Sequence, residues 1–176
     1  MNTLVIYSSQ TGFTERYAKW IAETLDADVL SIKEAKKKQD TFFSSFEAII
    51  YGGWNMGGKL VNAEWFLEKA VKWKEKKLVM FGVGATPEDD PEIQTFLDTM
   101  IPVEEKPYVR AFYCPGGLDY SKMNFFCRLV MKTMAKSMNK QENLSSYEKE
   151  KVKALLTSFD ASGKKFIEPI VDYMKD

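Results

Sequence analysis

Five short apolar runs recur along the chain, and each is separated from the next by a polar or amphipathic stretch. The runs cover residues 4–7, 29–32, 46–51, 78–83 and 108–114. The run at residues 4–7 is continuous, as expected of a strand that is covered on both faces in a parallel sheet, and the other runs are interpreted as strands as well. The pattern therefore predicts five buried strands.

Between these runs, apolar residues recur with helical spacing. One predicted helix covers residues 13–25, and a second covers 63–71 with Asn62 as its N-cap. A third helix begins after Asp90, which serves as its cap. Residues 33–45 are polar and basic, a composition that favours a surface helix or a loop. Strands and helices thus alternate, which predicts an α/β fold with a parallel sheet and helices on both faces.

The chain is longer than five strands and their helices require. One closing helix is expected near Pro169, which should kink that helix or shift its start. Residues 116–160 are left over, and we interpret them as an insertion after the fifth strand. Two helices are expected in it, at about 121–138 and 146–159. No composition change marks a boundary, so residues 1–176 are expected to form a single domain.

Composition narrows the chemistry further. The chain has 176 residues, 45% of them hydrophobic and 28% charged, which is typical of a soluble globular protein. No leader and no stretch of membrane-spanning length is apparent, so a cytoplasmic location is expected. Cys114 and Cys127 have no metal-binding spacing. The sequence has no histidine, which excludes Ser-His and Cys-His catalysis. We therefore expect no metal and no catalytic side chain, with a cofactor carrying any reaction.

The segment between the first strand and the first helix has three hydroxyl residues and one glycine in six positions. A helix N-terminus presents free N–H groups and partial positive charge, and hydroxyls add further donors. The segment lacks the lysine of a nucleoside-triphosphate loop and the glycines of a dinucleotide fingerprint. It predicts a phosphate site formed by Ser9, Gln10, Thr11, Gly12, Phe13 and Thr14.

This segment reads S-x-T-G-x-T and resembles T-x-T-G-x-T, the phosphate signature of flavodoxins. The resemblance implies a three-layer flavodoxin-like fold with strand order 2-1-3-4-5 and FMN at the carboxyl ends of the strands. It also implies that the flavin ring lies between the loops after the third and fourth strands. The expected ring contacts are Gly53, Trp54, Asn55, Met56, Gly57, Gly84, Ala85 and Thr86.

The predicted insertion is unusually basic. Residues 121–140 contain five basic residues and no acidic residue, although the net charge of the chain is zero. Four of them recur every four residues beside a Met-rich stripe, a pattern that suits a membrane surface or a hydrophobic partner. A core-packed helix with a solvated outer face explains the pattern equally well. The candidate contact residues are Arg128, Lys132, Lys136 and Lys140.

The segment YCPGGLDYSKMNFFCRLVMKTM, which begins at Tyr113, is similar to the same region of flavodoxin-type, quinone-dependent protoporphyrinogen oxidases. This resemblance implies oxidation of protoporphyrinogen IX in haem biosynthesis, with a quinone as acceptor. The implied substrate contacts are Gly116, Gly117, Leu118, Asp119 and Tyr120. The alternative is an electron carrier between soluble redox partner proteins. Nucleic acid is not expected as a partner.

Overall fold

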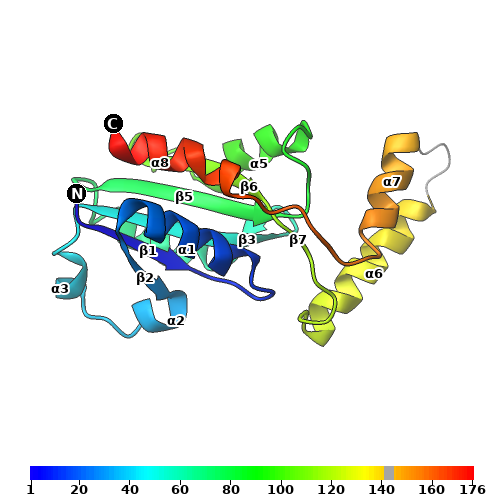
Figure 1. Ribbon diagram of the computed structural model, residues 1–176, viewed down its shortest axis with the longest axis horizontal. Helices are drawn as coiled ribbons and strands as arrows, with labels where there is room; N and C mark the ends of the chain where they lie inside the picture. The colour runs from blue at the N-terminus through cyan, green and yellow to red at the C-terminus, as the bar shows by residue number, and fades with distance from the viewer. Residues whose placement is uncertain (141–144) are drawn as a thin grey trace.

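The computed structural model describes residues 1–140 and 145–176. Its main sheet has five parallel strands in the order β2-β1-β3-β5-β6, which confirms the expected order 2-1-3-4-5 (Figure 1). A short strand, β4 (Lys59–Leu60), pairs antiparallel with the end of β3. The parallel strands are β1 (Thr3–Tyr7), β2 (Asp28–Ser31), β3 (Ala48–Met56), β5 (Lys77–Gly84) and β6 (Val109–Pro115).

Helices cover both faces of the sheet, as predicted. On one face α1 (Phe13–Leu25) and α8 (Glu168–Lys175) pack on the strands. On the other lie α4 (Ala63–Ala70) and α5 (Glu92–Met100). The polar segment 33–45 contains two short helices, α2 (Ile32–Ala35) and α3 (Asp40–Phe43). Among the described residues, no helix has both the length and the apolarity needed to cross a membrane.

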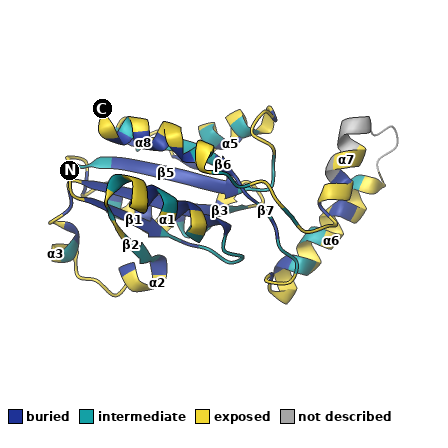
Figure 2. Cartoon of the chain, viewed as in Figure 1, coloured by how far each residue is buried: buried dark blue, intermediate teal, exposed yellow. Residues whose placement is uncertain are grey.

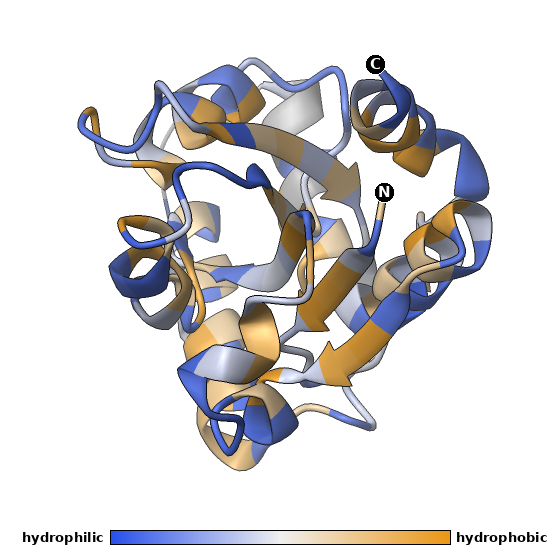
Figure 3. Cartoon of the chain, turned by 90° about the vertical axis from the view of Figure 1, so that its left-hand side faces the viewer, coloured by the Kyte–Doolittle hydropathy of each residue, from blue (hydrophilic) through white to orange (hydrophobic). Residues whose placement is uncertain are grey.

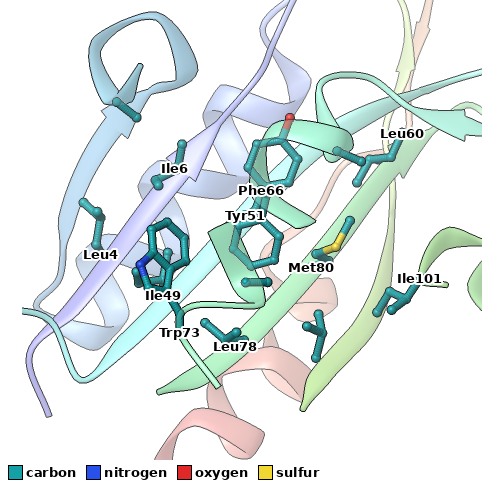
Figure 4. Close-up of a cluster of buried hydrophobic side chains, with 14 of the residues drawn as sticks. Leu4, Ile6, Ile49, Tyr51, Leu60, Phe66, Trp73, Leu78, Met80 and Ile101 are labelled. Carbon is teal, nitrogen blue, oxygen red and sulfur yellow. The ribbon is translucent and has the colours of Figure 1, made fainter. Parts of the chain in front are cut away.

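Successive side chains of a strand point to opposite faces, so each parallel strand contributes side chains to two hydrophobic cores, one on each face of the sheet. Ile6 and Met80 belong to the core under α4 and α5, whereas Val5 and Val79 belong to the core under α1 and α8. Figure 2 shows these strands as buried along most of their length. In Figure 3 the strands carry the strongest hydrophobic colour, while the helices alternate hydrophobic and hydrophilic stretches. Figure 4 shows the first core, in which Tyr51 stacks on Phe66.

The observed starts of two helices differ in detail from the two predicted N-caps. Asn62 occupies the N-cap position of α4 but its side chain does not cap the helix. Its backbone is left-handed, with φ at 60°, and its amide nitrogen donates instead to the Ser8 hydroxyl at 3.0 Å. Pro91, and not Asp90, occupies the N-cap position of α5; the Asp90 carboxylate just before it accepts from the backbone N–H of Glu92, the first helical residue, at 2.9 Å. Pro169 lies in the first turn of α8, where a 3-10 turn (Lys164–Ile167) precedes it.

The third strand is longer than predicted. The predicted strand stops at residue 51, whereas β3 runs on through Gly52 and Gly53 to Met56 and turns into β4 through Gly57 and Gly58. Both turn glycines have positive φ, at 60° and 83°, which glycine adopts without steric cost. The glycines inside the strand make room for neighbours, because a Cβ on Gly52 would lie 2.1 Å from the Phe81 ring.

The insertion leaves and rejoins the sheet through one short ribbon. β7 (Gly117–Leu118) pairs antiparallel with β8 (Phe159–Asp160). Between them α6 (Phe125–Asn139) and α7 (Ser146–Ala154) form an arm, which projects beyond the ends of the strands (Figure 1). The second helix ends at Ala154 and not at residue 159, so Phe159 belongs to β8. Residues 141–144 of the predicted insertion lie outside the described residues.

An ion pair fixes the ribbon to the first helix. The Arg16 guanidinium donates to the Asp160 carboxylate at 2.5 Å and to the Ser162 hydroxyl at 2.7 Å. Burial raises the pKa of Asp160, but the hydrogen bonds from Ser162 and Arg16 outweigh burial, so the pKa lies below its ordinary value. The first turns of α1 and the base of the arm are therefore held together.

Candidate functional site

A cavity of about 750 Å³ lies at the carboxyl ends of the parallel strands, between the sheet and the arm. This volume is within the usual range for small-molecule sites, roughly 300–1,000 Å³. Its lining includes most of the predicted cofactor residues and brings the three predicted loops together: Ser9, Gln10, Thr11, Phe13, Thr14, Trp54, Asn55, Met56, Gly57, Gly84, Ala85 and Thr86.

The predicted phosphate loop has the shape of an anion site. Gly12 has a φ of 99°, which places its backbone in a conformation that side chains disfavour. Its N–H donates to the Ser9 hydroxyl at 3.1 Å, and its carbonyl accepts from the Arg16 N–H at 3.0 Å. The Thr14 side chain lines the cavity in the first turn of α1 and is 1% exposed. The loop thus gathers hydroxyl groups around the N-terminus of α1.

The opposite side of the cavity is formed by two rigid segments. The Asn55 side chain accepts from the Gly58 N–H at 2.9 Å, which fixes the β3–β4 turn. The Tyr113 hydroxyl donates to the Thr86 carbonyl at 2.7 Å. Burial raises the pKa of Tyr113, so the hydroxyl stays protonated and remains a donor. A Cβ on Gly84 would lie 2.9 Å from this hydroxyl, which explains the glycine there.

Two predicted cofactor residues are not in the lining. Gly12 shapes the phosphate loop through its backbone angle, as described above. Gly53 lies inside β3, where a Cβ would lie 2.7 Å from Cγ of Leu60. Its lack of a side chain therefore lets the β3–β4 hairpin fold back, and only through that hairpin does Gly53 shape the cavity.

Of the predicted substrate residues, too, only some are in the cavity lining. Gly117 and Leu118 line the cavity, whereas Gly116, Asp119 and Tyr120 are not in its lining. The Gly116 N–H donates to the Gly84 carbonyl at 2.7 Å. Asp119 accepts from the Ser121 hydroxyl at 2.5 Å, a bond that lowers the pKa of its carboxyl, and the Tyr120 hydroxyl donates to the Leu155 carbonyl. These three residues hold the arm in place.

Sequence reasoning missed part of the wall. The inner side of α6 lines the cavity, and so do the end of α7, β8 and one side of α5. For the Met-rich stripe on α6, the sequence leaves open a membrane surface, a hydrophobic partner or packing against the protein's own core. The periodicity shows which residues share one face of the helix. What that face contacts depends on where the arm lies relative to the sheet. The added apolar lining residues include Met123, Cys127, Val130, Met131, Met134, Leu155, Phe159, Ile93 and Phe96.

The structure also separates the four basic candidate contact residues of α6, because only three of them are exposed. The Arg128 guanidinium folds back and donates to the Met123 carbonyl at 3.1 Å, so Arg128 is half-buried. Lys132, Lys136 and Lys140 are exposed. On the cavity side, the Gln10 amide donates to Sγ of Cys127 at 3.5 Å, which brings the phosphate loop against the first turn of α6.

These residues fit FMN. The helix N-terminus with its buried hydroxyl suits a phosphate, and the glycine-shaped loops with Trp54 and Met56 suit the faces and edge of a flavin ring. Trp54 and the phosphate loop line one continuous cavity, as a ligand with both groups requires.

Comparisons with known proteins found the following similarities. The structure of a flavodoxin from the domain Archaea is 15% identical, covers both chains fully and has a TM-score of 0.45. Oxidised Flavodoxin 2 from Bacillus cereus is 22% identical over 65% of this chain and 84% of its own, with a TM-score of 0.47. A flavoprotein from Lactobacillus acidophilus in complex with FMN is 12% identical over 65% of this chain and 91% of its own, with a TM-score of 0.44. No curated protein matches the chain. The family model described as a flavodoxin domain matches residues 4–145, and the chain therefore belongs to the flavodoxin domain family.

Proposed function

We propose that this protein is an FMN-dependent oxidoreductase whose substrate is a large, flat, apolar molecule of the protoporphyrinogen IX type. FMN supplies the redox chemistry when it is bound. Each turnover removes two electrons and two protons from the substrate and reduces one quinone to its quinol, so three quinones are consumed when a porphyrinogen, which loses six hydrogens, becomes the porphyrin. The observation that carries the proposal is the apolar wall that the arm adds to the FMN cavity.

That wall gives the protein a means of binding and orienting an apolar substrate. Leu118 at the base of the arm and Leu155 at the end of α7 are buried beside the cavity. Met123 and Met131 add flexible side chains, which adapt to an irregular apolar surface. An electron carrier that docks on soluble partners has no need of such a wall, since its flavin edge must stay accessible to the partner protein.

Charge in the lining indicates how the substrate is orientated. Among the described residues, the ionisable carboxyl groups of the lining are Glu92 and Glu150. A substrate carboxylate placed among apolar side chains and beside these groups would lose its hydration and meet like charge. The two propionates of protoporphyrinogen IX therefore project out of the opening. A porphyrinogen with carboxylates around its whole rim cannot avoid this cost, so it should be a poor substrate.

The test is an anaerobic turnover assay of the FMN-loaded protein with protoporphyrinogen IX, with and without a menaquinone analogue, followed by porphyrin fluorescence. We expect quinone-dependent turnover that is much weaker with coproporphyrinogen. Met131→Glu should abolish turnover and leave FMN affinity intact, whereas Leu156→Glu, on an exposed arm residue outside the lining, should change neither.

The carrier alternative predicts a different outcome of the same assay. If the protein oxidises neither porphyrinogen with any quinone but exchanges electrons with a soluble flavin reductase, the proposal is wrong and the carrier function is correct.

A further inference from the structure

The first turns of α6 expose large apolar side chains. Phe125 is 80% exposed, Phe126 is 64% exposed and Leu129 is 52% exposed. These three residues come from five consecutive positions, so they form a single patch at one end of the arm. Clustered exposed aromatic and aliphatic side chains mark an interaction surface, because isolated ones are common but contiguous patches are not.

The next turns of the same helix continue this surface with positive charge. Phe125, Leu129, Lys132 and Lys136 follow one another at spacings of four, three and four residues, which places them on one helix face. Lys132 and Lys136 are exposed, as is Lys140 at the helix end. The sequence from 121 to 140 has no acidic residue to offset them.

We propose that this outer face of the arm, formed by Phe125, Phe126, Leu129, Lys132, Lys136 and Lys140, binds the surface of an anionic lipid bilayer. The aromatic and leucine side chains enter the boundary between headgroups and acyl chains. The lysines keep their ammonium groups at the level of the lipid phosphates while their stems lie along the apolar surface. Positive charge beside exposed phenylalanines selects a bilayer over a water-soluble anion, because the anion offers nothing for the rings.

The same helix connects this outer face with the cavity. Val130 and Met134 are exposed and also line the cavity, and Phe126 precedes them at helical spacing. An apolar strip therefore runs from the outer face to the cavity opening. Resting on the proposed function, this strip gives an apolar substrate or quinone a route from the bilayer to the flavin site without full exposure to water.

Cosedimentation with vesicles tests the membrane contact without any turnover. The FMN-loaded full-length protein is mixed with vesicles of phosphatidylcholine alone, or of equal parts phosphatidylcholine and phosphatidylglycerol. We expect binding to the anionic vesicles only, and weaker binding as salt shortens the screening length. Changing Lys132, Lys136 and Lys140 together to Gln should lower the partition coefficient about a hundredfold, at about fivefold per lysine.

Matched control variants show whether binding depends on the outer face of the arm or only on the total positive charge of the protein. Changing Lys33, Lys37 and Lys175 to Gln removes the same charge from exposed positions on other elements and should leave binding unchanged. Phe125→Ser with Leu129→Ser should lower binding about tenfold or more, whereas Val103→Ser, at a residue 74% exposed elsewhere, should not.

The proposal is wrong if the native protein does not bind anionic vesicles at low salt, or if the two lysine triple variants lose binding equally. It is also wrong if the native protein is a dimer that the Phe125/Leu129 variant converts to monomers, because the face is then a contact between two copies. None of these depends on porphyrinogen turnover, so failure of the membrane contact and failure of the proposed enzyme activity are told apart.

Discussion

Thr14 offers the sharpest test of the phosphate site. It is the most deeply buried hydroxyl residue of the loop, at 1% exposure, and it lies in the first turn of α1 where the backbone N–H groups face the cavity. Thr14→Val keeps the shape of the side chain and its branching at Cβ, so it removes the hydroxyl with little change in packing. The variant therefore probes a hydrogen bond and not a cavity.

The size of the effect follows from what the hydroxyl donates to. A hydrogen bond to a charged group contributes about 1.5–3 kcal/mol, and the FMN phosphate is charged. The dissociation constant for FMN should therefore rise about 10- to 150-fold, since each 1.4 kcal/mol is a factor of about ten. Riboflavin has the same ring and no phosphate, so its affinity should stay within about twofold of the native value.

Fluorescence-quenching titrations of both ligands measure the difference. Thr24→Val serves as the matched control, because Thr24 lies in the last turn of the same helix, where its hydroxyl donates to the Trp20 carbonyl at 2.8 Å. That variant should bind FMN as the native protein does. Equal losses for FMN and riboflavin in Thr14→Val, or an unchanged FMN affinity, would show that the loop caps a helix and holds no phosphate.

Three further predictions address the ring side and the arm. Tyr113→Phe removes the donor to the Thr86 carbonyl, so it should lower the free energy of unfolding by about 1 kcal/mol and weaken FMN and riboflavin equally; denaturant titration and flavin titration measure the two effects. Gly117→Ala would place a Cβ 2.1 Å from the Phe159 carbonyl oxygen and should destabilise the protein by roughly 1–3 kcal/mol, whereas Gly163→Ala, whose nearest neighbour would be at 3.5 Å, should be tolerated in the same thermal melt. The pKa of Asp160 is below its ordinary value, so its carboxylate stabilises the fold above about pH 3.9 and this stabilisation is lost as pH falls further; Asp160→Asn should remove that part of the acid dependence of unfolding.

The strands were predictable from the five apolar runs, and the strand order followed from the resemblance of the phosphate loop to that of flavodoxins. Each of the five apolar runs overlaps an observed strand, and Ile6, Ile50 and Val79 are fully buried as a sheet covered on both faces requires. The phosphate loop was equally readable, since a hydroxyl-rich turn directly before a helix is defined by local sequence alone. Such features depend on neighbours in the chain and not on distant contacts.

Features that depend on distant contacts were missed. Gly52 and Gly53 resemble the end of a strand, but each is a glycine because Phe81 and Leu60, from other strands, occupy the space of a side chain. The later pair Gly57 and Gly58 was the available signal for a hairpin, since two glycines in a row suit a tight turn with positive φ. Sequence periodicity likewise found the stripe on α6 without indicating what faces it.

The position of the arm explains why one helix has apolar residues on more than one side. Loops that follow parallel strands emerge at the same edge of a sheet, so an insertion after β6 begins beside the cavity, where Gly116 bonds to Gly84. The β7–β8 ribbon then brings the chain back to the same point, and α6 lines the cavity between Cys127 and Met134. One side of α6 must therefore contact the site, through Met123 and Met131, while the other faces outward with Phe125 and Leu129. A helix that served only the core would place polar residues at those outward positions. These outward apolar residues, together with the exposed lysines that follow them on the same face, are the reason that we propose a contact with an anionic bilayer surface.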